Sequence, residues 1–287
     1  EIEGGQLRLP VIATPASPSA GGLKLFGRAI AGRNLPAFVG PAGLDSALQP
    51  TFARNKMGLF LAAGNGGADS LVGMAFGSTG TATTANVATT NLHTLIRRRE
   101  YLVTTAATTA VVGFRGAAQQ WLLGGPASGQ GGFHMVSRWG PATGVATATT
   151  RAFFGMRGSA AAPTDVNPST LTNICGMGWD NGDANIQFIH NDGAGTATKI
   201  NLGAAFPRPN VDRTAVYEIA LFAPPGTTQQ LNYEVTDLVS GAVATGTVTT
   251  DLPSTTTLLT PWSQYSVGGT SSVIGMMVSN CYVESDI

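Results

Sequence analysis

The residues that could carry out acid–base, nucleophilic or metal chemistry are few and scattered in this sequence. The three histidines, His93, His134 and His190, fall in separate strand-like stretches, and none has a second His or Cys at metal-ligand spacing. The sequence has no G-x-S-x-G, H-E-x-x-H or P-loop pattern. Cys175 has no partner near it in sequence, although a Cys–His pair could form in the fold. We therefore expect no catalytic residues, no metal site, no cofactor and no enzymatic activity.

Carboxylates give no clearer sign of catalysis. A glycosidase needs two acids that can come from distant strands, and the chain after Arg157 holds 11 Asp and Glu residues. Any fold would bring some of these acids together by chance. A polysaccharide-degrading enzyme is therefore the least favoured interpretation.

Two acidic turns concentrate oxygen ligands of the kind that hard cations prefer. They are Asp180-Asn181-Gly182-Asp183 and Asn191-Asp192-Gly193. Neither has the full EF-hand pattern, so we interpret both as turns in preference to Ca²⁺ sites.

Trp179 lies directly before the first of these turns. An exposed indole can stack on a sugar, and Asp180, Asn181 and Asp183 would add hydrogen-bonding groups beside it. Packing of Trp179 in the core is the equally favoured alternative. These four residues are the candidate glycan-binding site, and for Trp139, Trp262 and Tyr265 we favour packing.

Composition excludes several classes of protein. Charged residues make up 11% of the 287 residues, against about 25% in an average soluble protein. Basic and acidic residues number 16 each, which argues against nucleic acid as the main partner. No apolar run approaches the roughly 20 residues that span a bilayer, and the N-terminus does not resemble a secretory signal. With 43% hydrophobic residues, the chain can bury a large core.

Charge is nevertheless segregated along the chain. Up to Arg157 there are 13 basic and 5 acidic residues, and after it 3 basic and 11 acidic. This distribution favours contact between a basic and an acidic face, within one chain or between subunits. The only basic run is Arg97–Arg99. We expect a solvated or inter-subunit strand there, with Arg97 and Arg99 on the face of Tyr101 and Arg98 on the other.

Short runs of alternating apolar and polar residues, separated by turn formers, predict an all-β protein. The Asn181-Gly182 pair predicts a hairpin, and the chain to Leu202 a three-stranded meander. Asp165–Leu171 can form one helical turn with Asn167 as N-cap and Pro168 at its first position. A two-sheet antiparallel sandwich is the most economical arrangement. The main predicted strands are Gln119–Leu123, Gly132–Trp139, Arg151–Met156, Ile174–Trp179, Asn185–His190, Thr198–Leu202, Val216–Phe222, Leu231–Leu238, Val243–Thr249 and Ser272–Glu284.

The first part of the chain differs from the rest. Leu23–Arg28 and Leu35–Val39 predict a hairpin around Ala31–Asn34, and Pro41–Pro50 is expected to be a linker. We therefore divide the chain into an arm and linker, 1–56, and a sandwich domain, 57–287. Because an isolated hairpin is marginal in water, the arm needs a partner. Cys175 and Cys281 are expected to be reduced and buried, a single bridge between them being the alternative.

Several stretches resemble a known group of proteins. GFHMVSRWG, TRAFFGMRGS, APTDVNPSTLTNICGMGWDNGDANIQFIHNDGAGTATKINLGAAFPRP, VYEIALFAPPG and TTDLPSTTTLL are similar to the distal part of tailed-bacteriophage fibres and other virion structural proteins. LPVIATPASPSAGGLKLFGRAIAGRNLPAFVGPAGLDSALQP resembles the short N-terminal β arm of such fibres. The resemblance implies a concanavalin A-like, jelly-roll β-sandwich preceded by a β-hairpin arm.

The resemblance also implies a function. It indicates a virion structural protein, most simply a tail or head fibre, that is a homotrimer, joins other virion proteins through residues 1–56 and contacts a host surface glycan through its sandwich. It implies no catalytic residues, no nucleic-acid partner and no membrane insertion. The alternatives are a capsid decoration or cement protein without receptor binding, and a glycan-binding module.

Overall fold

A computed structural model describes residues 2–3, 6–19, 22–39, 45–47, 56–66 and 69–285. They belong to two compact units, Glu1–Arg54 and Asn55–Ile287. The secondary-structure elements are β1 (Ile2–Glu3), β2 (Gln6–Leu7), β3 (Lys24–Ile30), β4 (Arg33–Val39), β5 (Asp45–Ala47), β6 (Lys56–Leu61), β7 (Ser70–Val72), β8 (Phe76–Thr79), β9 (Thr81–Ala85), α1 (Leu92–Leu95), β10 (Arg98–Ala107), β11 (Val111–Gly116), β12 (Trp121–Leu122), β13 (Phe133–Thr143), β14 (Arg151–Arg157), the 3₁₀ turn η2 (Pro168–Thr170), β15 (Ile174–Trp179), β16 (Gln187–Asn191), β17 (Thr198–Asn201), β18 (Tyr217–Ala223), β19 (Leu231–Asp237), β20 (Val243–Val248), β21 (Leu258–Ser266) and β22 (Ser272–Ser285).

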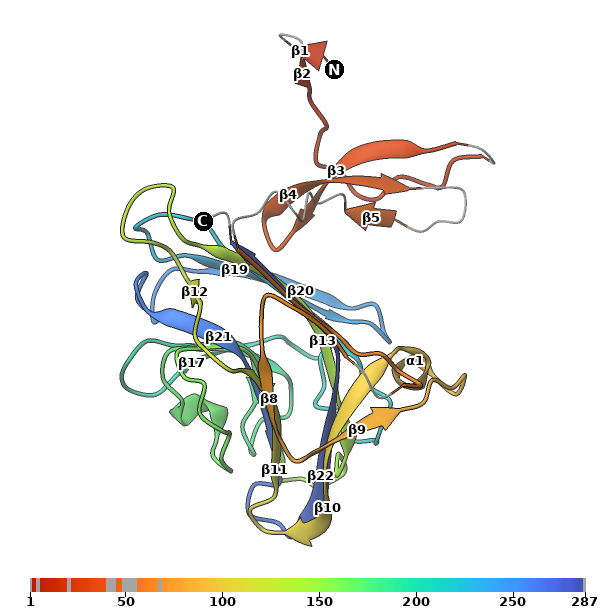
Figure 1. Ribbon diagram of the computed structural model, residues 1–287, viewed down its shortest axis with the longest axis vertical. Coiled ribbons are helices and arrows are strands. Elements are labelled where there is room, and N and C mark those ends of the chain that lie inside the picture. The colour runs from red at the N-terminus through yellow and green to blue at the C-terminus, as the bar shows by residue number, and fades with distance from the viewer. Residues whose placement is uncertain are drawn as a thin grey trace. The chain divides into compact units, whose positions relative to one another are not determined.

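The second unit is a sandwich of two antiparallel sheets (Figure 1). The nine-stranded sheet has the order β20-β19-β18-β13-β22-β10-β9, and β6 and β7 extend it beside β22. The eight-stranded sheet has the order β17-β16-β15-β14-β21-β11-β8, with β12 paired to β21. The predicted all-β antiparallel sandwich is confirmed.

Large aromatic side chains fill the space between the sheets. Alternate residues of each strand point inward, which places Trp139 of one sheet against Phe154 and Trp179 of the other. The ring centroids lie 5.7 Å apart for Trp139 and Phe154 and 5.9 Å apart for Trp139 and Trp179. Tyr265 meets the edge of Trp179 at 6.0 Å. All four side chains are essentially inaccessible to solvent, as expected of a close-packed core.

A long loop covers part of the outer face of the eight-stranded sheet. Trp262 and Phe153 point outward there and form a second apolar cluster with Leu171 of the loop. The Trp262 indole N–H donates to the Ala161 carbonyl over 2.8 Å, and the Gln264 amide donates to the Val166 carbonyl over 2.6 Å. The predicted helical turn lies in this loop as η2, with Pro at its start.

The predicted meander is also present. β15, β16 and β17 are consecutive antiparallel neighbours, as the Asn181-Gly182 pair indicated. The connection is longer than a two-residue turn: Asp183 N–H donates to the Asp180 carbonyl over 3.1 Å, and ladder pairing resumes only at Gln187. Gly182 does not take the left-handed backbone conformation that a tight Asn-Gly turn requires.

The first unit contains the predicted hairpin. β3 and β4 pair from Lys24 to Val39 around Ala31-Gly32, both of which have positive φ. Asp45–Ala47 forms a third strand against β4, so the linker prediction for Pro41–Pro50 is wrong at these residues and otherwise falls outside the described ones. Pro36 is opposite Gly27 of β3, whose N–H donates to the Pro10 carbonyl and whose carbonyl accepts from Ile12. The missing N–H of Pro36 therefore costs no hydrogen bond to β3.

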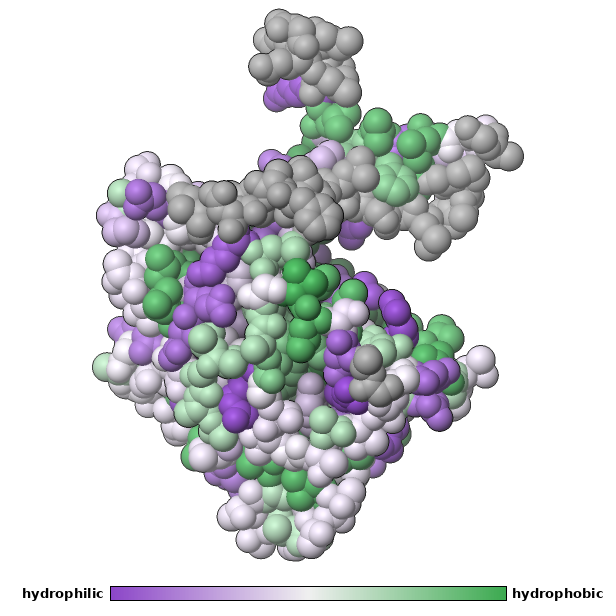
Figure 2. Space-filling view, viewed as in Figure 1, coloured by the Kyte–Doolittle hydropathy of each residue, from purple (hydrophilic) through white to green (hydrophobic). Residues whose placement is uncertain are grey.

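The surface of the protein matches its low charge. Figure 2 shows a face on which large areas are pale, the colour of residues of intermediate hydropathy, and purple and green residues are interspersed. Within the described part of the chain, no helix has the length and apolar character of a membrane span.

Both cysteines are free and fully buried. Burial raises the pKa of the Cys175 and Cys281 thiols to about 12, because a thiolate is poorly solvated in the core. The expectation of reduced, buried cysteines is confirmed.

We expect neither thiol to react with Ellman's reagent at pH 8 while the protein is folded, because the reactive thiolate is disfavoured and shielded. In denaturant both should react at once. Absorbance of the released thionitrobenzoate measures this, and a rapid stoichiometric reaction of native protein would contradict the buried placement of either residue.

Candidate functional site

Trp179, the proposed sugar-stacking residue, lies in the core. Its side chain has no exposed area, and its indole N–H donates to the Thr150 carbonyl over 3.1 Å. Trp139 and Tyr265 pack against its ring. A stacking role for Trp179 is incompatible with this burial, so packing, the alternative interpretation, describes it.

The carboxylates of the acidic turn after Trp179 form ion pairs with a lysine of the same chain, Lys199. The Lys199 ammonium lies 3.0 Å from Asp180 Oδ2 and 2.8 Å from Asp183 Oδ1. Burial lowers the pKa of Lys199, but hydrogen bonds and attraction from Asp183 and Asp180 outweigh this effect, and its pKa is raised. Asn181 is exposed at the tip of the turn. The structure thus brings Asp180 and Asp183 together, and their carboxylates neutralise Lys199.

The three histidines lie on different elements. His93 belongs to α1, His134 to β13 and His190 to β16. Cys175 and His190 are cross-strand partners, yet burial leaves the Cys175 thiol protonated. No group of three His, Cys, Asp or Glu side chains within the described ranges could hold a metal ion.

A small pocket opens beside the acidic turn. Its volume is about 270 Å³. Its walls come from the loop before β18, from the start of β18 and from the turn after β19, where antiparallel strands end together. The lining residues are Pro207, Arg208, Pro209, Asn210, Thr214, Ala215, Tyr217, Asp237 and Val239.

Some polar groups of the lining side chains already form hydrogen bonds within the protein, and others do not. Asp237 accepts from the backbone N–H of Val239 over 2.9 Å and from the Ser240 hydroxyl over 2.8 Å. The Thr214 hydroxyl donates to a loop carbonyl. By contrast, the Asn210 amide and the Tyr217 hydroxyl have no hydrogen-bond partner among the described residues. The Asn210 side chain is exposed and therefore available to a ligand. Tyr217 packs against Trp139 and is only 3% exposed, so a ligand can reach only the part of it that lines the pocket.

Arg208 connects the pocket to the acidic turn. Its guanidinium donates to the Thr147 carbonyl and the Thr150 hydroxyl, both at 2.8 Å, and to the Asn181 carbonyl at 3.3 Å. Its backbone N–H donates to Ala184. The turn predicted from the sequence and the pocket are therefore neighbours at the same end of the sandwich.

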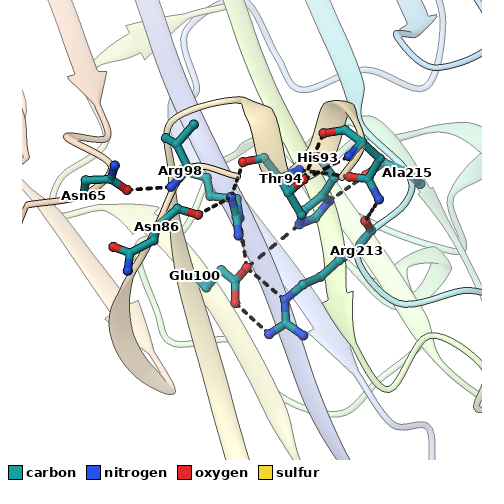
Figure 3. Close-up of polar contacts among 10 residues, drawn as sticks. Asn65, Asn86, His93, Thr94, Arg98, Glu100, Arg213 and Ala215 are labelled. Carbon is teal, nitrogen blue, oxygen red and sulfur yellow. Dashed lines mark hydrogen bonds and ion pairs between the residues drawn. The ribbon is translucent and has the colours of Figure 1, made fainter. Parts of the chain in front are cut away.

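An ionic cluster adjoins the Thr214–Ala215 wall of the pocket, and Figure 3 shows its side chains. It is buried except for the Arg213 side chain, which is 39% exposed. Glu100 of β10 is 3% exposed. Its carboxylate receives two hydrogen bonds from Arg213, at 3.1 and 2.9 Å, and one from Arg98 at 3.0 Å. Arg98 is itself buried and donates to the Thr94 carbonyl over 3.0 Å. The expectation of a solvated or inter-subunit strand at Arg97–Arg99 is thus wrong for Arg98, although Arg99 and Tyr101 do share a face.

The protonation states in this cluster follow from burial and charge. Burial raises the pKa of Glu100, but hydrogen bonds and attraction from Arg213 and Arg98 prevail, and the pKa is lowered. Burial lowers the pKa of His93, more than its hydrogen bond to Ala215 raises it. His93 Nδ1 lies 3.1 Å from that carbonyl and therefore donates to it. Glu100 is ionised and His93 neutral at pH 7.

The fold resembles that of known lectins. Peanut lectin, solved with a nine-residue peptide, aligns with 80% of this chain and 96% of its own at a TM-score of 0.51 and 14% identity. Lectin UEA-II complexed with galactose aligns with 82% of this chain and 100% of its own at a TM-score of 0.50 and 13% identity. A protein of unknown function from Shewanella oneidensis MR-1 aligns with 84% of this chain and 96% of its own at a TM-score of 0.53 and 10% identity. No family model and no curated protein matches the sequence.

These similarities establish a lectin-like, concanavalin A-like β-sandwich. They confirm the fold that the resemblance to virion proteins implied, and at these identities they show the fold alone.

Sequence reasoning missed Asn210, Tyr217 and Asp237 of the pocket. The feature of the sequence that comes nearest to indicating the pocket is Pro207-Arg208-Pro209-Asn210. Its two prolines restrict the backbone of the loop that carries the Asn210 side chain. Tyr217 and Asp237 belong to two strands, and only their pairing brings them together.

The lowered pKa of His93 predicts a pH-dependent stability. The unfolded chain takes up a proton near pH 6.5, the ordinary value for His, which folded His93 does not bind. The free energy of unfolding should therefore fall as the pH drops below 6.5, by up to about 1.4 kcal/mol per pH unit. Glu100 adds its own loss only below its ordinary value of 4.5.

Urea unfolding of the wild type and His93→Gln between pH 7.5 and 5.5 measures this contribution. The variant should show the smaller pH dependence over that range. Equal slopes would mean that His93 binds a proton equally well in the folded and unfolded chains, so that its pKa is not lowered by folding.

Proposed function

We propose that this chain is a non-catalytic glycan-binding protein whose recognition site is the pocket at Asn210, Tyr217 and Asp237. The observation that carries the proposal is the pair of unpartnered polar groups in the pocket, the Asn210 amide and the Tyr217 hydroxyl. Sugar hydroxyls both donate and accept hydrogen bonds, so they can satisfy an amide and a phenol together. A few polar groups in a concave site are what orient a small ligand.

The pocket favours a single neutral sugar ring. Ligand pockets for drug-sized molecules span roughly 300–1,000 Å³, and this one, at about 270 Å³, lies just below that range. The Asp237 carboxylate on its wall can accept from a sugar hydroxyl, and its charge is balanced by the Arg208 guanidinium, which also lines the pocket, so the pocket favours a neutral sugar. The side chains of Pro207, Pro209 and Val239 offer apolar surface to the C–H face of a pyranose.

The fold supports this proposal by analogy. UEA-II, whose structure is similar to this one, is described as complexed with galactose. That is a property of the other protein, and it supports a carbohydrate ligand here only through the shared fold.

Binding without turnover is part of the proposal. Glu100, the buried carboxylate behind the pocket, has both oxygens engaged by arginine and a lowered pKa, which does not suit a general acid. The Asp180 and Asp183 carboxylates are engaged by Lys199.

We expect Asn210→Ala to weaken binding of a neutral glycan at least about tenfold, equal to about 1.4 kcal/mol, because the amide is the least committed polar group in the pocket. A glycan array of neutral and acidic oligosaccharides identifies a ligand, and isothermal titration then measures its affinity for each variant.

Asn181→Ala is the matched control, since Asn181 is also an exposed-loop asparagine but does not line the pocket. It should bind as the wild type does, and both variants should keep the wild-type Tm. Loss of binding in Asn181→Ala with normal binding in Asn210→Ala would move the site to the acidic turn. Binding confined to acidic glycans would contradict the neutral ligand.

A second proposal concerns the biological setting of the protein. We infer that the chain is a virion structural protein, most simply a fibre component, located in a bacteriophage particle and assembled as a homotrimer. Its support is the resemblance of its sequence to tailed-bacteriophage fibre proteins, together with the separate unit Glu1–Arg54. Residues 1–56 would join other virion proteins and the sandwich would meet the host surface glycan. A capsid decoration protein without receptor binding is the nearest alternative.

Deletion of residues 1–50 tests this placement. The truncated chain should retain the circular dichroism and cooperative melting of the sandwich, because the large core lies within Asn55–Ile287. It should no longer enter particles when it replaces the full chain during assembly, as measured by immunoblot of purified virions. Undiminished incorporation would show that attachment does not use the arm.

A further inference from the structure

The pocket wall formed by Thr214 and Ala215 follows a residue in an unfavourable backbone conformation. Arg213 has a φ of 54°, in the left-handed region that is disfavoured for residues with a Cβ. Such a conformation persists only where surrounding contacts impose it. The shape of this wall therefore depends on contacts outside the pocket.

The contacts that impose it come from Glu100 and from the segment around α1 (Figure 3). The Arg213 side chain holds Glu100 through two hydrogen bonds. The Asn91 side-chain amide donates to the Arg213 carbonyl over 3.0 Å, and His93 Nδ1 donates to the Ala215 carbonyl over 3.1 Å. The side chain of Arg213 and the carbonyls on both sides of Thr214 are thus held.

The groups that hold the wall belong to regular elements. Glu100 lies within β10, between β9 and β22. Asn91 caps α1, where it accepts from Thr94 N–H over 3.0 Å. Arg98 links the two by binding both Glu100 and the Thr94 carbonyl. A carboxylate buried in a sheet and fixed by a second arginine has little freedom to follow a moving loop.

Close packing on the opposite side completes the restraint. A Cβ added to Gly140 of β13 would lie 2.3 Å from the Ala215 carbonyl oxygen. Gly140 therefore leaves the space in which the Ala215 carbonyl lies.

We propose that Glu100 is the positioning residue of the pocket: it does not line the pocket, but through Arg213 it sets the wall at Thr214 and Ala215. The predicted effect of Glu100 on ligand affinity rests on the proposed glycan-binding function. Its predicted effect on the order of residues 210–216 does not, so the two effects can be tested separately.

Hydrogen–deuterium exchange of wild type and Glu100→Gln tests the positioning directly. Gln keeps the shape of Glu100 but removes the charge that holds Arg213. Amides of residues 210–216 should exchange about tenfold faster or more in the variant, while β13 and β15 keep their protection. Affinity for the sugar identified on the array should fall at least about tenfold.

Glu218→Gln is the matched control. It breaks another ion pair of the same sheet, Arg138–Glu218 at 2.6 Å, and should leave exchange in residues 210–216 unchanged. If Glu100→Gln does not fold, Asn91→Asp replaces it, because a carboxylate can still cap α1 but cannot donate to the Arg213 carbonyl. It should also speed exchange in residues 210–216.

The possible outcomes are distinct. Faster exchange in residues 210–216 with weaker sugar binding supports the proposal in full. Faster exchange in a protein whose wild type binds no glycan supports the positioning and refutes the proposed function. Unchanged exchange in residues 210–216 in the folded variant overturns the positioning role, whatever the sugar affinity.

Discussion

Burial of two sheet faces against each other is the interaction on which the rest of this structure depends. Trp139, Phe154, Trp179 and Tyr265 meet across the interior, and truncating one such aromatic residue costs about 3–5 kcal/mol. The same packing fixes the strand ends, and with them Asp237 at the end of β19 and the loop that carries Asn210. It also explains why Trp179 is unsuited to ligand binding, since an indole that stabilises the interior cannot also present a face to solvent.

The strand order places strands from the basic first part of the chain beside strands from the acidic second part. β13 comes from the basic first part of the chain but lies between β18 and β22 of the acidic second part, and β14 likewise lies between β15 and β21. Arg138 therefore meets Glu218 at 2.6 Å, and Arg151 meets Asp165 at 3.5 Å. Of the two alternatives raised by the charge distribution, contact within one chain accounts for these pairs.

The sequence predicted the strands and turns that local patterns specify. It did not predict features that depend on which distant segments pair. The meander from Ile174 and the arm hairpin follow from alternation and turn residues, and both are present. β21 was missed because Pro261 and its polar residues break the apolar pattern, yet its Ser263 and Gln264 are buried and hydrogen-bonded to other segments. Arg98 was expected to be solvated because the sequence shows only its local partner, Glu100, two residues away. Both side chains are buried because α1 and Arg213 contact them, and Arg213 is distant in sequence.

The size of the pocket bears on how such a protein could hold a large ligand. A pocket of about 270 Å³ would contact little more than one sugar ring, and the few hydrogen bonds available there would give modest affinity for a single site. If the wall is held in place by Glu100 and Arg213 as proposed, the ordering cost of binding would be smaller, which would improve affinity without new contacts. Several copies joined through their arms would add effective concentration on a repetitive glycan surface, and avidity can exceed single-site affinity by a factor of roughly 10²–10⁴. The proposed oligomer and the proposed small site are thus compatible: a small pocket with modest affinity would be useful on a cell surface chiefly when it is presented more than once.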